Sequence, residues 1–181
     1  LITGGNSGLG LESAKRLAVG GANLILTVQS EAKGKAAVKA VQEYLKEHGI
    51  AKNKEQWIEY RILNLDSLAS VKEQVGSWLK SDESFQIDVL INNAGIFALP
   101  ERELTVDGLE KQMHVNHLGH FVLTALVKDR LSPNARIINI GSEAHKRAAK
   151  HGAGLDLAYA WTADSDYGGL KSYGQSKLAN V

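Results

Sequence analysis

Two side chains near the C-terminal end of the sequence have types and a spacing suited to proton transfer. Tyr173 and Lys177 lie four residues apart. On a helix, residues i and i+4 share a face, so the phenol and the ammonium would point into the same space. A free phenol titrates near ~10, and a nearby cation favours the charged form of such an acid. An ordinary amphipathic helix offers the same short pattern, so the other motifs of the chain decide between the two interpretations.

A glycine-rich turn lies far upstream of this pair. Gly4, Gly8 and Gly10 follow the apolar residues Leu1 and Ile2 and precede a helical pattern. Glycine lets the backbone turn tightly and approach a ligand closely, and a helix N-terminus attracts phosphate. The spacing G-x-x-x-G-x-G differs from the better-known G-x-G-x-x-G, and a turn without a ligand is the alternative. The pattern favours a dinucleotide-binding turn.

The remaining sequence alternates between strand and helix patterns. Expected strands cover 1–3, 23–28, 57–63, 87–91 and 135–140. Expected helices cover 8–18, 36–47, a segment capped by Ser67 and running through Leu79, 107–130 and a segment beginning at Ser172. This alternation predicts an α/β fold with a doubly wound parallel sheet (Rossmann-type), as a single domain over residues 1–181. Residues 145–169 show no clear period and are expected to form a long surface excursion.

Composition and charge exclude several classes of protein. The net charge is +1, with both signs mixed along the chain, and no basic stripe indicates nucleic acid. No apolar run approaches the ~20 residues that a membrane span needs, and no signal peptide is visible. A cytoplasmic location is expected, and a lost targeting segment is the alternative, because the sequence opens at Leu1 without a methionine. His114, His117 and His120 lie at i, i+3 and i+6 of one predicted helix, so their side chains point in progressively different directions. No carboxylate lies among them at ligand spacing. We therefore expect no metal site.

The end of the second expected strand bears on the choice of dinucleotide. An acid there binds the ribose hydroxyls of NAD, and an arginine accommodates the 2′-phosphate of NADP. The residue at this place is Gln29, which is neither. The missing acid favours NADP(H) over NAD(H). Lys33 and Lys35 are near enough in sequence to meet a phosphate, although solvated helix charges would look the same.

Taken together, the motifs resemble the short-chain dehydrogenase/reductase family in its single-domain form. In chain order they are the Thr3–Gly10 turn, matching T-G-x-x-x-G-x-G; residues 92–95, matching N-N-A-G; Asn116; Ser142; and Tyr173 with Lys177, matching Y-x-x-x-K. The amino-acid sequences around Asn116 and after Tyr173 most resemble those of the retinol-dehydrogenase and WW-domain-oxidoreductase-like branch. The resemblance covers essentially the whole chain.

The resemblance implies roles for four catalytic residues. Tyr173 would be the general acid in reduction and the base in oxidation, and Lys177 would assist it and hydrogen-bond the nicotinamide ribose. Ser142 would hydrogen-bond the substrate oxygen, and Asn116 would hold a water that links Lys177 to solvent. The residues expected at the cofactor are Gly4, Asn6, Ser7, Gly8, Leu9, Gly10, Gln29, Asn64, Leu65, Asn92, Ala94, Gly95, Tyr173 and Lys177.

The sequence also departs from the family pattern. Gln29 stands where the branch often has arginine, and Asn64 stands where an aspartate usually meets the adenine. Asn64 can still donate and accept hydrogen bonds. Gly141-Ser142 replaces a serine pair, and the longer gap from Ser142 to Tyr173 implies an inserted loop beside the substrate. The chain starts late in the first strand and stops one turn past Lys177. We therefore expect a fragment that lacks the last strands and the substrate-covering segment.

Three functions fit these observations. The first is an oxidoreductase that transfers a hydride between NADP(H) and a small-molecule alcohol, aldehyde or ketone, lipophilic substrates included. The second is a non-catalytic NAD(P)-binding sensor or interaction module. The third is a sugar-nucleotide epimerase, which shares Y-x-x-x-K but spaces its glycine turn differently. A homo-oligomer is compatible with the sequence in each case.

Overall fold

The computed structural model describes residues 1–51, 55–81, 84–150, 154–156 and 167–181. Its sheet has the strand order β3-β2-β1-β4-β5. The pairs β1–β2, β2–β3 and β1–β4 are parallel. The strands are β1 (Ile2–Thr3), β2 (Leu24–Val28), β3 (Ile58–Ile62), β4 (Ile87–Asn92) and β5 (Leu131–Asn139). This order, which reverses direction at β1, is that of a Rossmann-type sheet and confirms the predicted fold class.

The chain divides into two compact units. The sheet unit comprises residues 1–64, 87–94 and 132–138, and the helical unit comprises residues 65–86, 95–131 and 139–181. The expectation that residues 1–181 act as one domain stays a prediction. None of the helices in the described parts of the chain is long and apolar enough to cross a membrane.

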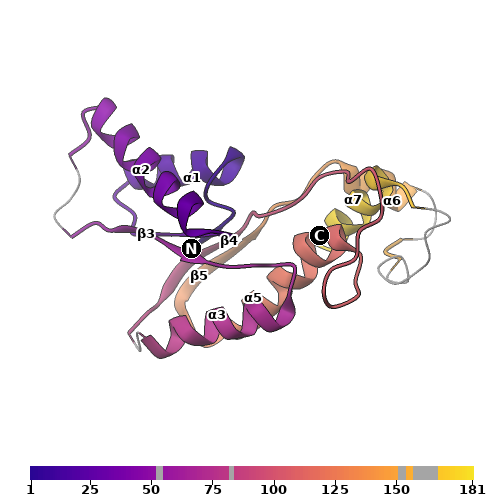
Figure 1. The fold of residues 1–181 in the computed structure, drawn as a ribbon. Helices are drawn as coiled ribbons and strands as arrows, with labels where there is room; N and C mark the ends of the chain where they lie inside the picture. The colour runs from indigo at the N-terminus through magenta and orange to yellow at the C-terminus, as the bar shows by residue number, and fades with distance from the viewer. Residues whose placement is uncertain (52–54, 82–83, 151–153, 157–166) are drawn as a thin grey trace. The chain divides into compact units, whose positions relative to one another are not determined.

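The sheet unit is built around β2. All five residues of β2 are buried, as expected for a strand of a parallel sheet that is covered on both faces. The helices α1 (Gly8–Val19) and α2 (Glu31–Glu47) pack against it (Figure 1). Helix α2 begins five residues earlier than expected. Ser30 is its N-cap, and the Ser30 side chain accepts a hydrogen bond from the Lys33 backbone N–H at 3.4 Å.

The helical unit contains the long helix predicted for 107–130, but not with those bounds or as one regular helix. It consists of α4 (Lys111–Met113), the π-helical turn η1 (His114–Leu118), α5 (Gly119–Val127) and the 3₁₀ turn η2 (Lys128–Arg130). Helix α4 begins after Glu110, whose buried carboxylate accepts hydrogen bonds from the backbone N–H groups of Gln112 at 3.1 Å and Met113 at 2.7 Å. These two bonds fix the start of the helix four residues later than predicted.

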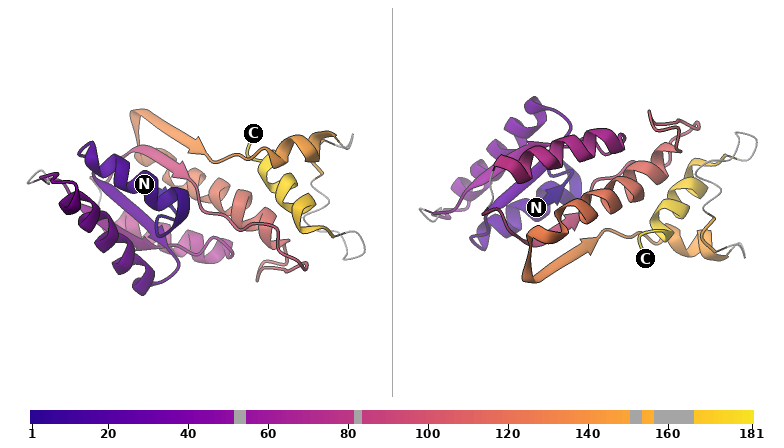
Figure 2. Two further views of the ribbon diagram at one scale, coloured as in Figure 1. Left: turned by 90° about the horizontal axis from the view of Figure 1, so that it is seen from above. Right: turned by 90° about the horizontal axis from the view of Figure 1, so that it is seen from below.

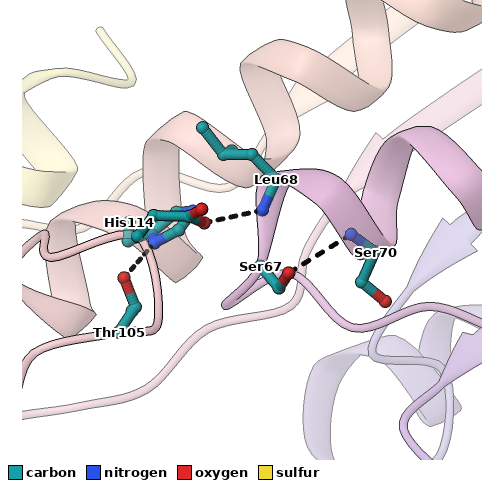
Figure 3. Close-up of polar contacts among 6 residues, drawn as sticks. Ser67, Leu68, Ser70, Thr105 and His114 are labelled. Carbon is teal, nitrogen blue, oxygen red and sulfur yellow. Dashed lines mark hydrogen bonds and ion pairs between the residues drawn. The ribbon is translucent and has the colours of Figure 1, made fainter.

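Asp107, the predicted first residue of the helix 107–130, caps another helix instead. Helix α3 (Leu68–Ser81) buries Val71, Val75 and Trp78, and the Asp107 carboxylate accepts a hydrogen bond from the Leu68 N–H at 2.8 Å. Ser67 accepts another from the Ser70 N–H at 3.2 Å, which confirms its predicted capping role (Figure 3). The Thr105 hydroxyl contacts Nδ1 of the buried His114 at 2.6 Å (Figure 3).

Two helices near the C-terminal end lie side by side, α6 (Ala144–Lys150) and α7 (Gly169–Leu178) (Figure 2). A Cβ at Gly174 would lie 3.0 Å from the Ala144 carbonyl oxygen, so glycine allows their close approach. The excursion predicted for 145–169 is therefore partly helical, and its residues 151–153 and 157–166 lie outside the described residues. Helix α7 begins three residues before the predicted Ser172, at the point where Gly169 packs against Leu99.

The packing of α2 on β3 gives a test of the sheet unit. A Cβ at Gly34 would lie 2.2 Å from the Tyr60 ring, whereas one at Gly76 in α3 would meet nothing within 4 Å. We expect Gly34→Ala to lower the free energy of unfolding by about 1–3 kcal/mol, because the ring must move. Gly76→Ala, the matched control, should raise it by up to about 1 kcal/mol through helix propensity. Urea unfolding of both variants measures this, and equal effects would contradict the packing described.

Candidate active site

The glycine turn of the sheet unit is pressed against the segment that follows β4. Gly4 has φ +65°, and a Cβ there would lie 2.9 Å from Ala94 Cα. A Cβ at Gly10 would lie 2.5 Å from both Asn93 Nδ2 and the Gly4 carbonyl oxygen. Side chains at these two positions would push the turn and the β4 segment apart. The structure thus explains why glycine stands at both.

Thr3 links the ends of β1 and β4. Its hydroxyl oxygen accepts hydrogen bonds from the backbone N–H groups of Asn93 and Ala94, both at 2.9 Å. The Asn93 side chain returns a bond to the Thr3 carbonyl, also at 2.9 Å. Sequence reasoning treated Thr3 only as part of a motif and missed this role. A hydroxyl residue at the end of a strand, directly before a glycine turn, was the available signal.

The first turn of α1 is the place where the sequence predicts binding of a dinucleotide pyrophosphate. Ser7, Gly8 and Leu9 are exposed, and the Ser7 side chain makes no capping bond in the described structure. The backbone N–H groups of this turn, and the partial positive charge of the helix N-terminus, therefore face outward. Asn6 lies half-buried beside them. These are the features that bind phosphate oxygens at the start of a helix.

The residues predicted at the adenosine side occupy strand ends. Gln29 follows β2 and is exposed, and its side-chain oxygen accepts a hydrogen bond from Lys33 Nζ at 3.1 Å. Lys35 instead pairs with Glu31 at 2.7 Å. Asn64 lies half-buried just after β3, and Asn92 ends β4 and is buried. The two lysines of α2 therefore have different partners. The Lys33 ammonium lies beside Gln29, just after the end of β2, whereas Lys35 pairs with Glu31.

Leu65, also predicted at the cofactor, belongs to the helical unit and is buried there. A Cβ at Gly119 would lie 2.7 Å from the Leu65 carbonyl oxygen and 3.0 Å from its Cβ. Its side chain thus packs against α5. A cofactor contact by Leu65 stays a prediction.

The buried side chain of Asn116 makes three hydrogen bonds within the helical unit. It lies in the π-helical turn and is 1% exposed. Its side-chain oxygen accepts a bond from the Ile96 N–H at 2.8 Å, while its amide donates to the Ile96 carbonyl at 3.0 Å and to Ser176 Oγ at 2.9 Å. Single π-helical turns occur often at functional sites. This one joins the segment after Gly95 to helix α7.

Tyr173 and Lys177 both lie on α7, as their spacing predicted. Lys177 Nζ is 5.7 Å from the centroid of the Tyr173 ring and donates a hydrogen bond to the Ile140 carbonyl at 2.9 Å. Burial lowers the pKa of the Lys177 ammonium. A Cβ at Gly95 would lie 3.1 Å from Asn116 Oδ1 and 3.8 Å from Lys177 Nζ, so the backbone at Gly95 closely approaches both.

Ser142 lies in the turn between β5 and α6 and is half-buried. Its hydroxyl oxygen accepts a hydrogen bond from the Ala144 N–H at 3.3 Å, and its carbonyl accepts one from the His145 N–H at 3.1 Å. The structure thus brings Asn116, Tyr173 and Lys177 into one neighbourhood: Asn116 is linked to Tyr173 through Ser176, and Lys177 Nζ lies 5.7 Å from the Tyr173 ring centroid. Ser142 belongs to the same unit, and its contact with a substrate oxygen stays a prediction.

Sequence reasoning missed two residues that orient this cluster. Ser176 Oγ donates to the Tyr173 carbonyl at 2.8 Å while it accepts the bond from Asn116. Asn180 Nδ2 donates to the Asn116 carbonyl at 3.1 Å, and Asn180 Oδ1 contacts His117 Nδ1 at 3.0 Å. Each lies three residues after a predicted catalytic residue, Ser176 on the same face of α7 as Tyr173 and Asn180 just past the end of the helix. That spacing was the signal in the sequence.

The three helical histidines have different partners. His114 contacts Thr105, His117 contacts Asn180, and His120 Nδ1 lies 3.1 Å from the Asn116 carbonyl. Among the described residues, no three histidine, aspartate or glutamate side chains are placed to hold a metal ion. The described contacts therefore give these histidines roles in hydrogen bonding.

Comparison with known proteins identifies relatives of this arrangement. A family model described as short chain dehydrogenase matches residues 1–154. Human retinol dehydrogenase 13 is 39% identical over all of this chain, which spans 50% of that protein. Human WW domain-containing oxidoreductase is 37% identical over the whole chain, which spans 42% of that protein. The chain thus covers about half the length of these relatives, and the branch that the motifs indicated is confirmed.

A solved structure agrees with this result. A blue fluorescent protein from a metagenomic library, in complex with NADPH, is 29% identical, with a TM-score of 0.67. The match covers 98% of this chain and 62% of that protein.

The buried imidazole beside Asn116 predicts a pH effect on stability. Burial lowers the pKa of His120 from 6.5 to about 4. Between these pH values His120 binds a proton in the unfolded chain and does not in the folded chain. The contribution of His120 to the free energy of unfolding is therefore full above pH ~6.5 and is lost as the pH falls. We expect His120 to contribute about 2 kcal/mol to the loss of unfolding free energy from pH ~7 to pH ~5. Urea unfolding at both pH values should show that loss reduced in His120→Asn and unchanged in His48→Asn, an exposed control.

Proposed function

The chain belongs to the short-chain dehydrogenase family, and from this premise we propose that it is an NADP(H)-dependent oxidoreductase that interconverts an alcohol and a carbonyl compound. The observation that carries the proposal is the cluster formed by Asn116, Tyr173, Ser176 and Lys177, with the Gly95 backbone against it. A small-molecule alcohol, aldehyde or ketone is the proposed substrate. A cytoplasmic location and a homo-oligomer stay predictions.

The proposed mechanism assigns the proton transfer to Tyr173. A bound nicotinamide would supply or accept the hydride. In reduction the Tyr173 hydroxyl gives its proton to the substrate oxygen, and in oxidation the phenolate removes it. The Lys177 ammonium, close to the ring, stabilises the phenolate by its positive charge. Ser142 would hold the substrate oxygen by a hydrogen bond.

Asn116 has a different first role in this proposal than the resemblance implies. Its carboxamide already bonds Ile96 and Ser176, so we assign it the positioning of α7 relative to the Gly95 segment. Its carbonyl already accepts a hydrogen bond from Asn180. A water held by Asn116 stays a prediction.

The proton transfer can be tested by removing one oxygen. We expect Tyr173→Phe to lower kcat by about 10²-fold or more, because a positioned acid–base group contributes ~10²–10⁴-fold. The Kd for NADPH should change little, since the ring and its neighbours are kept. NADPH oxidation with a panel of aldehydes and ketones, together with nucleotide titration, measures both. Tyr44→Phe in α2 is the control.

Two results would contradict this assignment. Full activity in Tyr173→Phe would remove Tyr173 from the mechanism. Tight nucleotide binding by the unchanged protein, without turnover on any substrate, would favour the non-catalytic sensor.

The preference for NADP(H) rests on the end of β2. Gln29 leaves this place without the acid that would bind the ribose hydroxyls of NAD. The bond from Lys33 to Gln29 puts an ammonium at the same place. The related structure in complex with NADPH adds support. We propose that Lys33 and Gln29 together receive the 2′-phosphate.

The two lysines of α2 make this preference testable. Removal of a charge that meets the phosphate should weaken NADPH binding about tenfold and leave NADH binding nearly unchanged. We expect this result for Lys33→Ala. Lys35→Ala should change neither affinity, because Lys35 is exposed and pairs with Glu31. Fluorescence titration with both nucleotides measures the affinities, and equal losses for NADPH and NADH in Lys33→Ala would contradict the assignment.

A further inference from the structure

An exposed aromatic ring lies against the proposed proton donor. Phe97 is 66% exposed, although phenylalanine is usually buried. Its ring meets the Tyr173 ring edge-on, with the centroids 4.8 Å apart and the planes at 81°. This is a favourable arrangement for two aromatic rings. One part of Phe97 thus contacts Tyr173 while most of its surface remains open.

The backbone holds Phe97 from both sides. Before it, the Ile96 N–H and carbonyl both bond the Asn116 side chain. After it, the Leu99 carbonyl accepts a hydrogen bond from the Tyr167 hydroxyl at 3.3 Å. A Cβ at Gly169 would lie 2.1 Å from that same carbonyl oxygen, so the N-terminus of α7 packs tightly on Leu99. The segment that carries Phe97 is therefore fixed at both ends.

The residue between these anchors is strained. Ala98 has φ +48°, in the left-handed region that non-glycine residues seldom adopt. Such strain persists where the surroundings over-determine the backbone, and it gathers at functional sites. Leu170, three residues before Tyr173 on α7, is 58% exposed and lies on the same helix face as Tyr173. Two apolar side chains therefore flank the Tyr173 position and remain open to solvent.

On the basis of the proposed function, we propose that Phe97 is a specificity-determining residue that receives the apolar group bonded to the reacting carbon. The substrate class is then an aldehyde, ketone or alcohol that carries an alkyl chain or an aryl ring next to the oxygen-bearing carbon. Contact with such a group covers the exposed face of Phe97 and places the substrate oxygen on the side of Tyr173. A charged or polyhydroxylated substituent would make no favourable apolar contact with the Phe97 ring.

A series of linear aldehydes from propanal to octanal tests the proposal in the NADPH assay. In the unchanged protein, kcat/KM should rise with chain length. Phe97→Ala should lower kcat/KM for octanal by about tenfold or more and for propanal by less than about twofold, and Phe97→Leu should restore most of the difference. Phe121→Ala is the matched control, because Phe121 is 64% exposed but contacts His117. Equal losses for both aldehydes, or no loss, would overturn the proposal.

A binding measurement separates this proposal from the proposed function. The chain has three phenylalanines, Phe85, Phe97 and Phe121, so fluorine NMR of protein labelled with para-fluorophenylalanine gives three signals, assignable by substitution. Octanol should shift the Phe97 signal to saturation and leave the equally exposed Phe121 signal unmoved. This result without turnover on any aldehyde would remove the proposed function and retain the apolar site. An unmoved Phe97 signal, equal shifts at Phe121, or a Phe97 shift caused by protein concentration alone would overturn the site.

Discussion

The side-chain amide of Asn116 is the contact on which the helical unit's candidate active site depends. A buried amide must satisfy its polar atoms, and Asn116 does so with both backbone groups of Ile96 and with Ser176. One side chain therefore fixes the start of the segment that carries Phe97 and the helix that carries Tyr173. Asn116 makes these bonds from within the π-helical turn His114–Leu118.

The candidate residues of the two units depend on different physical means. In the sheet unit, Gly4 and Gly10 leave out side chains so that backbones meet and a helix N-terminus faces outward. Attraction for phosphate then comes from main-chain dipoles. In the helical unit, the roles proposed for Tyr173 and Lys177 depend on their own functional groups, and the Lys177 ammonium lies where burial lowers its pKa. Main-chain groups can bind a cofactor that many enzymes share, whereas the chemistry of a particular reaction depends on particular side chains.

Local patterns in the sequence were sufficient for much of this description. The apolar run of β2, the glycine turn and the Tyr173–Lys177 spacing depend on neighbouring residues, so they could be predicted. The early start of α2 was also readable, because Ser30 is a good N-cap. The π-helical turn and the late start of α4 could not be predicted. Asn116 in that turn bonds Ser176, which is far away in the sequence, and the Glu110 carboxylate caps α4 from a buried position, which the sequence does not reveal.

The loop before α4 has a consequence for protein engineering. Within a few residues, Asp107 closes the N-terminus of α3 and Glu110 opens α4. A designer who grafts this loop from a relative would also replace the caps of two helices. We expect a donor loop without acids at both places to lower the thermal stability of the protein. Keeping the two carboxylates fixed while varying the residues between them gives the safer library.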